Sequence, residues 1–303
     1  MAVDDPDTHM TLDDVLKGPA DGFKGVLGVS VKHLGTGEEA SHNGDRLFPT
    51  ASVFKVPVLV EFYRQAERGA LSPDQQVVLT ERDKVPGSGV LKELSEGLSV
   101  SLRDLLSLMM MVSDNTATDL VAGRVGFDNV NATLDELGLH RTRVVRYCRE
   151  ILFDLVGVND LPPEKMTLGL FGEVSEAREY GGSWSLGVED NDVTTPNEMS
   201  RLLEMIVDGE AAGRESCDEI LAIMGKCQTG QYRVPKYLPT KKLLLQRKTG
   251  SLPGIRNDVA VVTVKETGER YLISCFTMGA EDVYGAEETI AKVSQGVYEY
   301  FTG

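Results

Sequence analysis

The order of predicted elements along the chain favours an α+β fold built around a mostly antiparallel sheet. β-branched, alternating sequence occurs near the N-terminus at residues 25–33 and again in the last third at 241–279. The middle third carries amphipathic helical patterns instead. Because strands at both ends enclose helices rather than alternate with them, we predict one sheet assembled from the two termini with a helical lobe inserted, not a fold of parallel βαβ units.

The first elements are a predicted hairpin and a helix. "GVLGVSVKH" (25–33) alternates like a strand, and "GTGEEASHNGD" after it supplies turn residues. A helix is predicted from Ser52 to about Arg68, ended by "RGALSP", because apolar residues recur close to helical spacing: Val56, Val60 and Phe62. Ser52 therefore lies at or near a helix start.

Helical patterns continue through the middle of the chain. "SVSLRDLLSLMMM" begins with a serine cap, and "NTATDLVAGRV" and "FDNVNATLDELGL" repeat the apolar face. "DVTTPNEMSRLLEMIVDG" places Thr-Pro at a helix start, and another helix is predicted near 213–226. Residues 141–192 lack a clear period, so we interpret them as a long ordered loop or an insertion.

The last third contains three predicted strands and a closing helix. "KKLLLQRKTG", "NDVAVVTVK" and "RYLISCFTMG" are strand-like, and "AEETIAKVSQGVYEYF" is an amphipathic helix. We therefore assign residues 1–48 and 197–303 to a lobe containing the sheet. Residues 49–196 form the helical lobe, and the two lobes make one functional unit.

Composition excludes several classes of function. The 303 residues carry a formal charge of −16, which repels phosphate backbones and anionic lipids, so we expect neither a nucleic-acid nor a membrane partner. The four cysteines and four histidines show no metal-ligand spacing and no CxxC pair. We predict free thiols, no metal and no organic cofactor.

No apolar run approaches the length of a membrane span, and the first residues, "MAVDDPDTHMTLDDVLKG", lack the basic and apolar regions of an export signal. For the chain as given, a cytoplasmic location is expected. A periplasmic or secreted location is expected if a signal segment has been removed. The oligomeric state is not predicted.

Three short motifs carry candidate chemistry. "SVFK" places Ser52 and Lys55 one helical turn apart, and a lysine with a lowered pKa can take the proton of a serine hydroxyl. "VSDNTAT" supplies Ser113 and Asn115 between two predicted helices, and "RKTGS" supplies Lys248 on a predicted strand. Taken singly, the first is typical of a helix cap beside a surface lysine, the second of a helix N-cap and the third of an edge strand.

Together and in this order, the motifs resemble the S-x-x-K, S-D-N and K-T-G set of class A β-lactamases and penicillin-binding proteins. "FPTASVFKVPVL", "DVTTPNEM", "TGQYRVPKYLP" and "RNDVAVV" are also similar to class A segments, which extends the resemblance from about Gly25 to Phe301. The resemblance implies a sheet flanked by helices and packed on an inserted helical domain, with the catalytic serine between them.

The resemblance also implies roles for residues of the first two motifs. Ser52 would be the acylated nucleophile and Lys55 its nearby base. Ser113 would pass a proton toward the leaving nitrogen, and Asn115 would orient Lys55 and the substrate amide. Lys248 would lower neighbouring pKa values and attract an anionic substrate. The implied partner is a small acyl substrate, a β-lactam or a similar anionic amide or ester.

The remaining residues implied by the resemblance bind substrate. Thr249 and Arg256 would hold its carboxylate, with Arg256 matching the family's arginine after a one-residue gap. Gly250 completes the third motif. The backbone N–H groups of Ser52 and Ser251 would form the oxyanion hole, a feature that contributes about 3 to 4 kcal/mol to transition-state stabilisation.

The resemblance breaks down at the residue that releases the acyl group. Class A enzymes use a glutamate followed four residues later by asparagine, and no glutamate between 141 and 192 has that partner. Glu179 suits the spacing counted back from Asp192, and Glu150 suits the spacing counted forward from Ser113, with Asp154 four residues beyond it. Three functions stay open: a β-lactam hydrolase, slow or fast; an esterase, amidase or peptidase; and a penicillin-interacting protein that is acylated without turnover.

Overall fold

The computed structural model describes residues 10–158, 160–176 and 188–303. Its helices are α1 (Leu12–Asp21), α2 (Lys55–Glu67), α3 (Leu102–Met111), α4 (Asn115–Val125), α5 (Phe127–Glu136), α6 (Cys148–Leu155), α7 (Leu168–Glu176), α8 (Pro196–Asp208), α9 (Arg214–Met224) and α10 (Val283–Thr302). Its strands are β1 (Val26–His33), β2 (Glu39–His42), β3 (Phe48–Pro49), β4 (Gln76–Val78), β5 (Ser99–Ser101), β6 (Val193–Thr194), β7 (Leu243–Leu252), β8 (Ile255–Val264) and β9 (Arg270–Met278).

The main sheet joins the two ends of the chain. Its strand order is β2-β1-β9-β8-β7, and every neighbouring pair is antiparallel. β1 pairs with β9 along its whole length, with Val29 opposite Cys275. The α+β fold and the sheet built from both termini, predicted from sequence, are confirmed.

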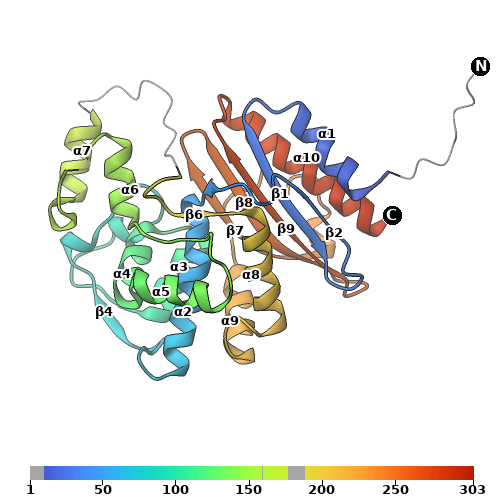
Figure 1. The fold of residues 1–303 in the computed structure, drawn as a ribbon. Helices are drawn as coiled ribbons and strands as arrows, with labels where there is room; N and C mark the ends of the chain where they lie inside the picture. The colour runs from blue at the N-terminus through green and yellow to red at the C-terminus, as the bar shows by residue number, and fades with distance from the viewer. Residues whose placement is uncertain (1–9, 159, 177–187) are drawn as a thin grey trace, which may run out of the picture.

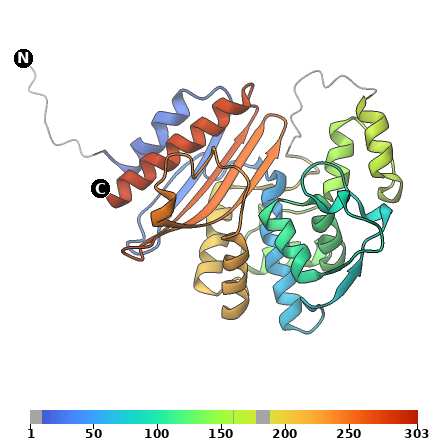
Figure 2. The same ribbon diagram turned by 180° about the vertical axis from the view of Figure 1, so that it is seen from behind.

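Both faces of this sheet are buried, as alternation along β8 demonstrates. Val259 and Val261 belong to the core shared with α2 and α8, whereas Ala260 and Val262 belong to the core shared with α1 and α10. Figures 1 and 2 show α1 and α10 covering the outer face, with α8 and α9 between the sheet and the other helices. The edge of β7 is thereby brought to the junction with the helical part.

α2 is the central helix of the helical part. It contacts α3, α4, α5 and α9 and is buried almost all round, which is the expected environment for a helix with apolar residues on every side. Side-chain caps fix the starts of its neighbours: Ser101 accepts from the Asp104 N–H, Asp114 from Ala117 and Thr195 from Glu198. The starts of α3, α4 and α8 agree with those predicted from the sequence.

The structure refines two sequence predictions. Ser52 lies near a helix start as predicted, but in a 3₁₀ turn, Ala51–Phe54, and α2 itself begins at Lys55. The described part of residues 141–192 contains α6, a 3₁₀ turn (Pro163–Lys165) and α7, which fits the insertion rather than the long loop. All four cysteines are free. Within the described ranges no helix is both long and apolar enough to cross a membrane.

Candidate active site

The turn that carries Ser52 is held from two directions. Ala51, the preceding residue, has a φ of 44°, an uncommon conformation for a residue other than glycine that requires support from its surroundings. That support comes from β8, where Asn257 Nδ2 donates to the carbonyl oxygens of Pro49 at 2.9 Å and Thr50 at 3.0 Å. The sheet therefore fixes the backbone just before Ser52, the predicted nucleophile.

Lys55 is completely buried beneath this turn. Its Nζ donates to the Ser113 carbonyl oxygen at 2.8 Å, to Ser113 Oγ at 3.0 Å and to Asn115 Oδ1 at 3.0 Å. Three acceptors occupy the three N–H donors of an ammonium group. Burial nevertheless lowers the pKa of Lys55, which favours the neutral amine that a general base needs.

Ser113 joins two buried lysines. Lys248, also fully buried, donates from Nζ to Ser113 Oγ at 2.9 Å and to the Thr249 carbonyl oxygen at 2.7 Å. Burial lowers the pKa of Lys248 well below its usual value, and the charge of Lys55 acts in the same direction. Ser113 has a φ of 57°, so the segment between α3 and α4 adopts an uncommon backbone to place this hydroxyl. The result is a continuous path for a proton between two amines.

Glycine at position 250 allows β7 to approach the nucleophile turn. A Cβ atom there would lie 2.5 Å from the Thr50 carbonyl oxygen and 3.2 Å from the Ser52 nitrogen. Such contacts are closer than a methyl group tolerates, so only glycine fits. This close approach brings the Ser251 backbone beside the Ser52 backbone, as an oxyanion hole built from their two N–H groups requires.

The sequence analysis missed Arg233, a cation that contacts this strand. Its guanidinium is 4% exposed, and it donates to Ser251 Oγ at 2.6 Å and to the Gly250 carbonyl oxygen at 2.9 Å. Arg256, the predicted carboxylate ligand, instead donates to the carbonyl oxygens of Leu252 and Ile255 and lies 3.6 Å from Glu287. The "TGQYRVP" segment resembles the family, but its sequence alone does not show that its arginine contacts β7.

Two buried carboxylates fix the start of α6 near Lys55. Asp119 Oδ1 accepts from the Cys148 N–H at 2.8 Å, and Asp192 Oδ1 accepts from the Val145 and Arg146 N–H groups at 2.7 and 2.9 Å. Carboxylates at a helix N-terminus satisfy N–H groups that lack partners within the helix. α6 therefore presents Cys148 to the site in a fixed position.

Of the two glutamates predicted to release the acyl group, only Glu150 belongs to the described residues, and it does not line the pocket. The Glu150 carboxylate accepts from the Tyr147 N–H at 2.8 Å, so it caps α6. Glu179 lies outside the described residues. Among the residues that are described, no group of acidic, histidine and cysteine side chains is arranged to hold a metal ion.

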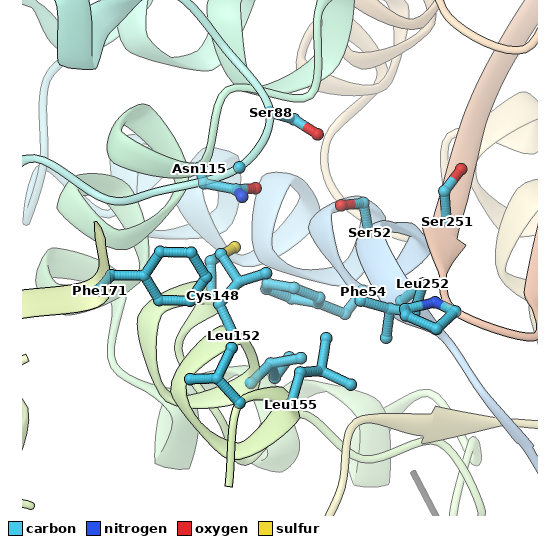
Figure 3. A pocket seen from close by; sticks show the side chains of 15 residues that line it. Ser52, Phe54, Ser88, Asn115, Cys148, Leu152, Leu155, Phe171, Ser251 and Leu252 are labelled. Carbon is cyan, nitrogen blue, oxygen red and sulfur yellow. The ribbon is translucent and has the colours of Figure 1, made fainter. Parts of the chain in front are cut away.

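Ser52 opens into a pocket of about 280 Å³ (Figure 3). Asn115, Ser88 and Ser251 line it on the polar side, and the wall supplied by α6 consists of Cys148, Ile151, Leu152 and Leu155. The structure thus brings Ser52 together with Ser251 and Asn115 at the pocket, and Asn115 in turn with Lys55. Ser113 and Lys248 lie in the buried network behind them.

A family model described as the beta-lactamase enzyme family matches residues 11–301. The chain belongs to this family. Among curated relatives, a beta-lactamase of Proteus vulgaris is 25% identical over 97% of each chain. A beta-lactamase of Pseudomonas aeruginosa, VEB-1, is 23% identical over 91% of this chain and 85% of its own length. The membership predicted from the three motifs is confirmed, and the protein is a hydrolase of the β-lactamase type.

Solved structures agree with the family assignment. The beta-lactamase of Sphaerobacter thermophilus DSM 20745 aligns with a TM-score of 0.77 at 28% identity, over 95% of this chain and 96% of its own. PBP-A, also solved as a mutant in an acyl-enzyme complex with penicillin-G, shares the fold with a TM-score of 0.75 at 23% identity, over 96% of this chain and 95% of its own. The β-lactamase fold therefore covers nearly the whole chain.

Proposed function

We propose that this family member is a serine acyl hydrolase that β-lactams acylate on Ser52 and that releases the acyl group slowly. The observation that carries the proposal is the buried network in which Ser113 Oγ lies 3.0 Å from Lys55 Nζ and 2.9 Å from Lys248 Nζ, next to the pocket that contains Ser52. Two amines with lowered pKa values and a shared hydroxyl can both take and return a proton.

Acylation then proceeds in two steps. Neutral Lys55 accepts the Ser52 hydroxyl proton while Ser52 Oγ attacks the lactam carbonyl, and the N–H groups of Ser52 and Ser251 stabilise the resulting oxyanion. As the C–N bond breaks, the leaving nitrogen takes the hydroxyl proton of Ser113, which Lys55 replaces. The product is an ester on Ser52 with the ring opened.

Anion recognition falls to the strand side of the site. Lys248, Thr249 and Arg233 gather around Ser251, because Lys248 donates to the Thr249 carbonyl and Arg233 to Ser251 Oγ. Thr249 Oγ1 also lies 2.5 Å from Thr229 Oγ1, which orients its hydroxyl. Arg233 keeps its charge here, although it also pairs with Glu287 at 3.1 Å, and in a chain of net charge −16 this cation suits a substrate with a carboxylate.

Hydrolysis of the ester needs a base for water, and the described pocket lining supports a slow step. Cys148, Ile151 and Leu152 form the wall beside Ser52, and no carboxylate is among the described lining residues. Absence of a positioned base costs about 10²- to 10⁴-fold in rate. Lys55 can still activate water, and Glu179 stays a candidate from sequence.

Intact-mass spectrometry of the protein mixed with penicillin, beside a ring-opening absorbance assay, tests this function. We expect an adduct on Ser52 that decays slowly and disappears in Ser52→Ala. Full turnover in Ser52→Ala would remove the site assignment. Glu150→Ala and Glu179→Ala test the two carboxylates: a longer-lived adduct in either variant would identify the base.

A further inference from the structure

One wall of the Ser52 pocket is apolar, and the family's reaction does not explain it. Its lining comes from three places on the chain: Phe54 after the nucleophile, Leu252 and Pro253 at the end of β7, and residues of α6 and α7. Figure 3 shows Phe171, Leu152 and Leu155 on the side away from Ser251. Asn115 lies near Phe171 and Cys148 in the same view (Figure 3), with Ser88 beyond it, so polar side chains border this wall on one edge.

The α6 part of this wall follows a helical stripe. Cys148, Ile151, Leu152 and Leu155 are spaced three and four residues apart, so they share one face of the helix, and all of them line the pocket. Phe171 of α7 extends the stripe, with its ring centroid 5.4 Å from that of Phe153. This edge-on ring contact braces Phe171 from behind. The apolar wall is therefore formed by regularly spaced side chains that pack against their neighbours.

The chemistry of the wall selects its occupant. A charged group lying against the α6 residues and Phe171 would lose its hydration and contact mainly apolar side chains, since the polar lining residues such as Asn115 lie only at the border of the wall. Each buried methylene of an apolar group would instead favour binding about fourfold. The wall also adjoins Ser52 directly, so a group seated on it can be attached to the carbonyl under attack.

We infer that the acyl donor of this protein carries an apolar acyl group, of about the size of a phenyl ring or a medium-length alkyl chain, which binds against α6 and Phe171. This inference rests on the proposed acylation of Ser52 and adds the class of substrate. The carbonyl then lies at the oxyanion hole, and the polar or anionic leaving part lies toward Ser251 and Lys248.

A series of p-nitrophenyl esters tests the inference: acetate, butyrate and hexanoate, with the monoester of adipic acid as a charged counterpart of hexanoate. The second-order rate constant of nitrophenolate release in the first turnover is measured, with the adduct located by mass spectrometry. We expect a rise of about fourfold per methylene from acetate to hexanoate and a low rate for the charged ester.

Variants locate the subsite. Leu152→Ala and Phe171→Ala should lower the hexanoate-to-acetate ratio several-fold. Leu244→Ala is the matched control, because Leu244 is 42% exposed on β7 and does not line the pocket. Its ratio should equal that of the unmodified protein.

The outcomes separate this inference from the proposed function. A Ser52 adduct that forms at the same rate with every ester would overturn the apolar subsite and leave Ser52 acylation standing. A rise with chain length that persists unchanged in Leu152→Ala and Phe171→Ala would also overturn it. Failure of penicillin and all esters to label Ser52 would instead remove the proposed function.

Discussion

Placing a carboxylate at position 148 should convert slow deacylation into fast deacylation. The Cys148 side chain is 4% exposed and lines the same pocket as Ser52, and Lys55 is close enough to act on it electrostatically. Burial raises the pKa of the Cys148 thiol, so in the unmodified protein it is a neutral group and a poor base for water. Glutamate has three more heavy atoms beyond the position of the sulfur, and the cavity of about 280 Å³ offers room for them.

The expected gain in Cys148→Glu follows from general-base catalysis, which contributes about 10²- to 10⁴-fold. The lysine beside the new carboxylate favours its ionised form, whereas burial and the neighbouring Asp119 oppose it. Burying this charge should also lower stability by roughly 1 to 3 kcal/mol. Acylation should become slower, because the new carboxylate also raises the pKa of Lys55 and so disfavours the neutral amine that takes the Ser52 proton.

Decay of the penicillin adduct after removal of free penicillin provides the assay, followed by intact mass. The matched control is Cys148→Gln, which has the same size and can hold water but cannot accept a proton efficiently. We expect Cys148→Glu to decay at least about 10²-fold faster than Cys148→Gln. Equal decay rates in the two variants would refute the reasoning, since volume rather than basicity would then explain any change.

Three further predictions concern the buried charges. Ser113→Ala should reduce acylation by about 10²- to 10⁴-fold and lower the free energy of unfolding by roughly 2 to 3 kcal/mol, because two buried ammonium groups lose an acceptor; a near-normal rate of adduct formation would contradict the relay. Lys248→Met should reduce acylation by about 10²-fold, because Ser113 Oγ loses one of the two lysine donors that position it; a stopped-flow acylation rate near that of the unmodified protein would contradict it. Burial raises the pKa of Asp192 to about 7, so the folded protein binds more protons than the unfolded chain and loses stability as pH rises from about 4 to 7. Urea unfolding across that range should show a smaller loss in Asp192→Asn, and an unchanged slope would argue against a titrating Asp192.

The residues proposed for acylation could be identified from sequence because they occur in short motifs on or beside regular elements. Ser52 and Lys55 are separated by one helical turn, and Lys248 precedes a glycine that only a close strand contact requires. Local patterns also set the caps Ser101 and Thr195, which fixed the starts of α3 and α8. Motif spacing and helix caps depend on residues that are close in sequence, so they can be predicted without knowledge of the fold.

The remaining parts of the site depend on contacts between distant residues. α6 begins where Asp119 accepts from the Cys148 N–H, while Asp192 accepts from the backbone just before the helix, and neither carboxylate is near it in sequence. Glu150 had suitable spacing for a catalytic base, yet its carboxylate caps α6. Arg233 is likewise brought to Ser251 only when two separate segments fold together. Spacing alone cannot distinguish a capping carboxylate from a catalytic one.

The join between the two ends of the chain has a consequence during synthesis. The carbonyls before Ser52 receive hydrogen bonds from Asn257, more than 200 residues later, and β1 can join the rest of the main sheet only when β9 has been made. At ribosomal rates that interval lasts roughly 10 to 40 s. In a nascent chain, Ser52 and Lys55 are therefore synthesised long before the contacts that position them can form. Covalent labelling by penicillin would report completion of the polypeptide, and ribosome-bound fragments that stop before β8 should stay unlabelled.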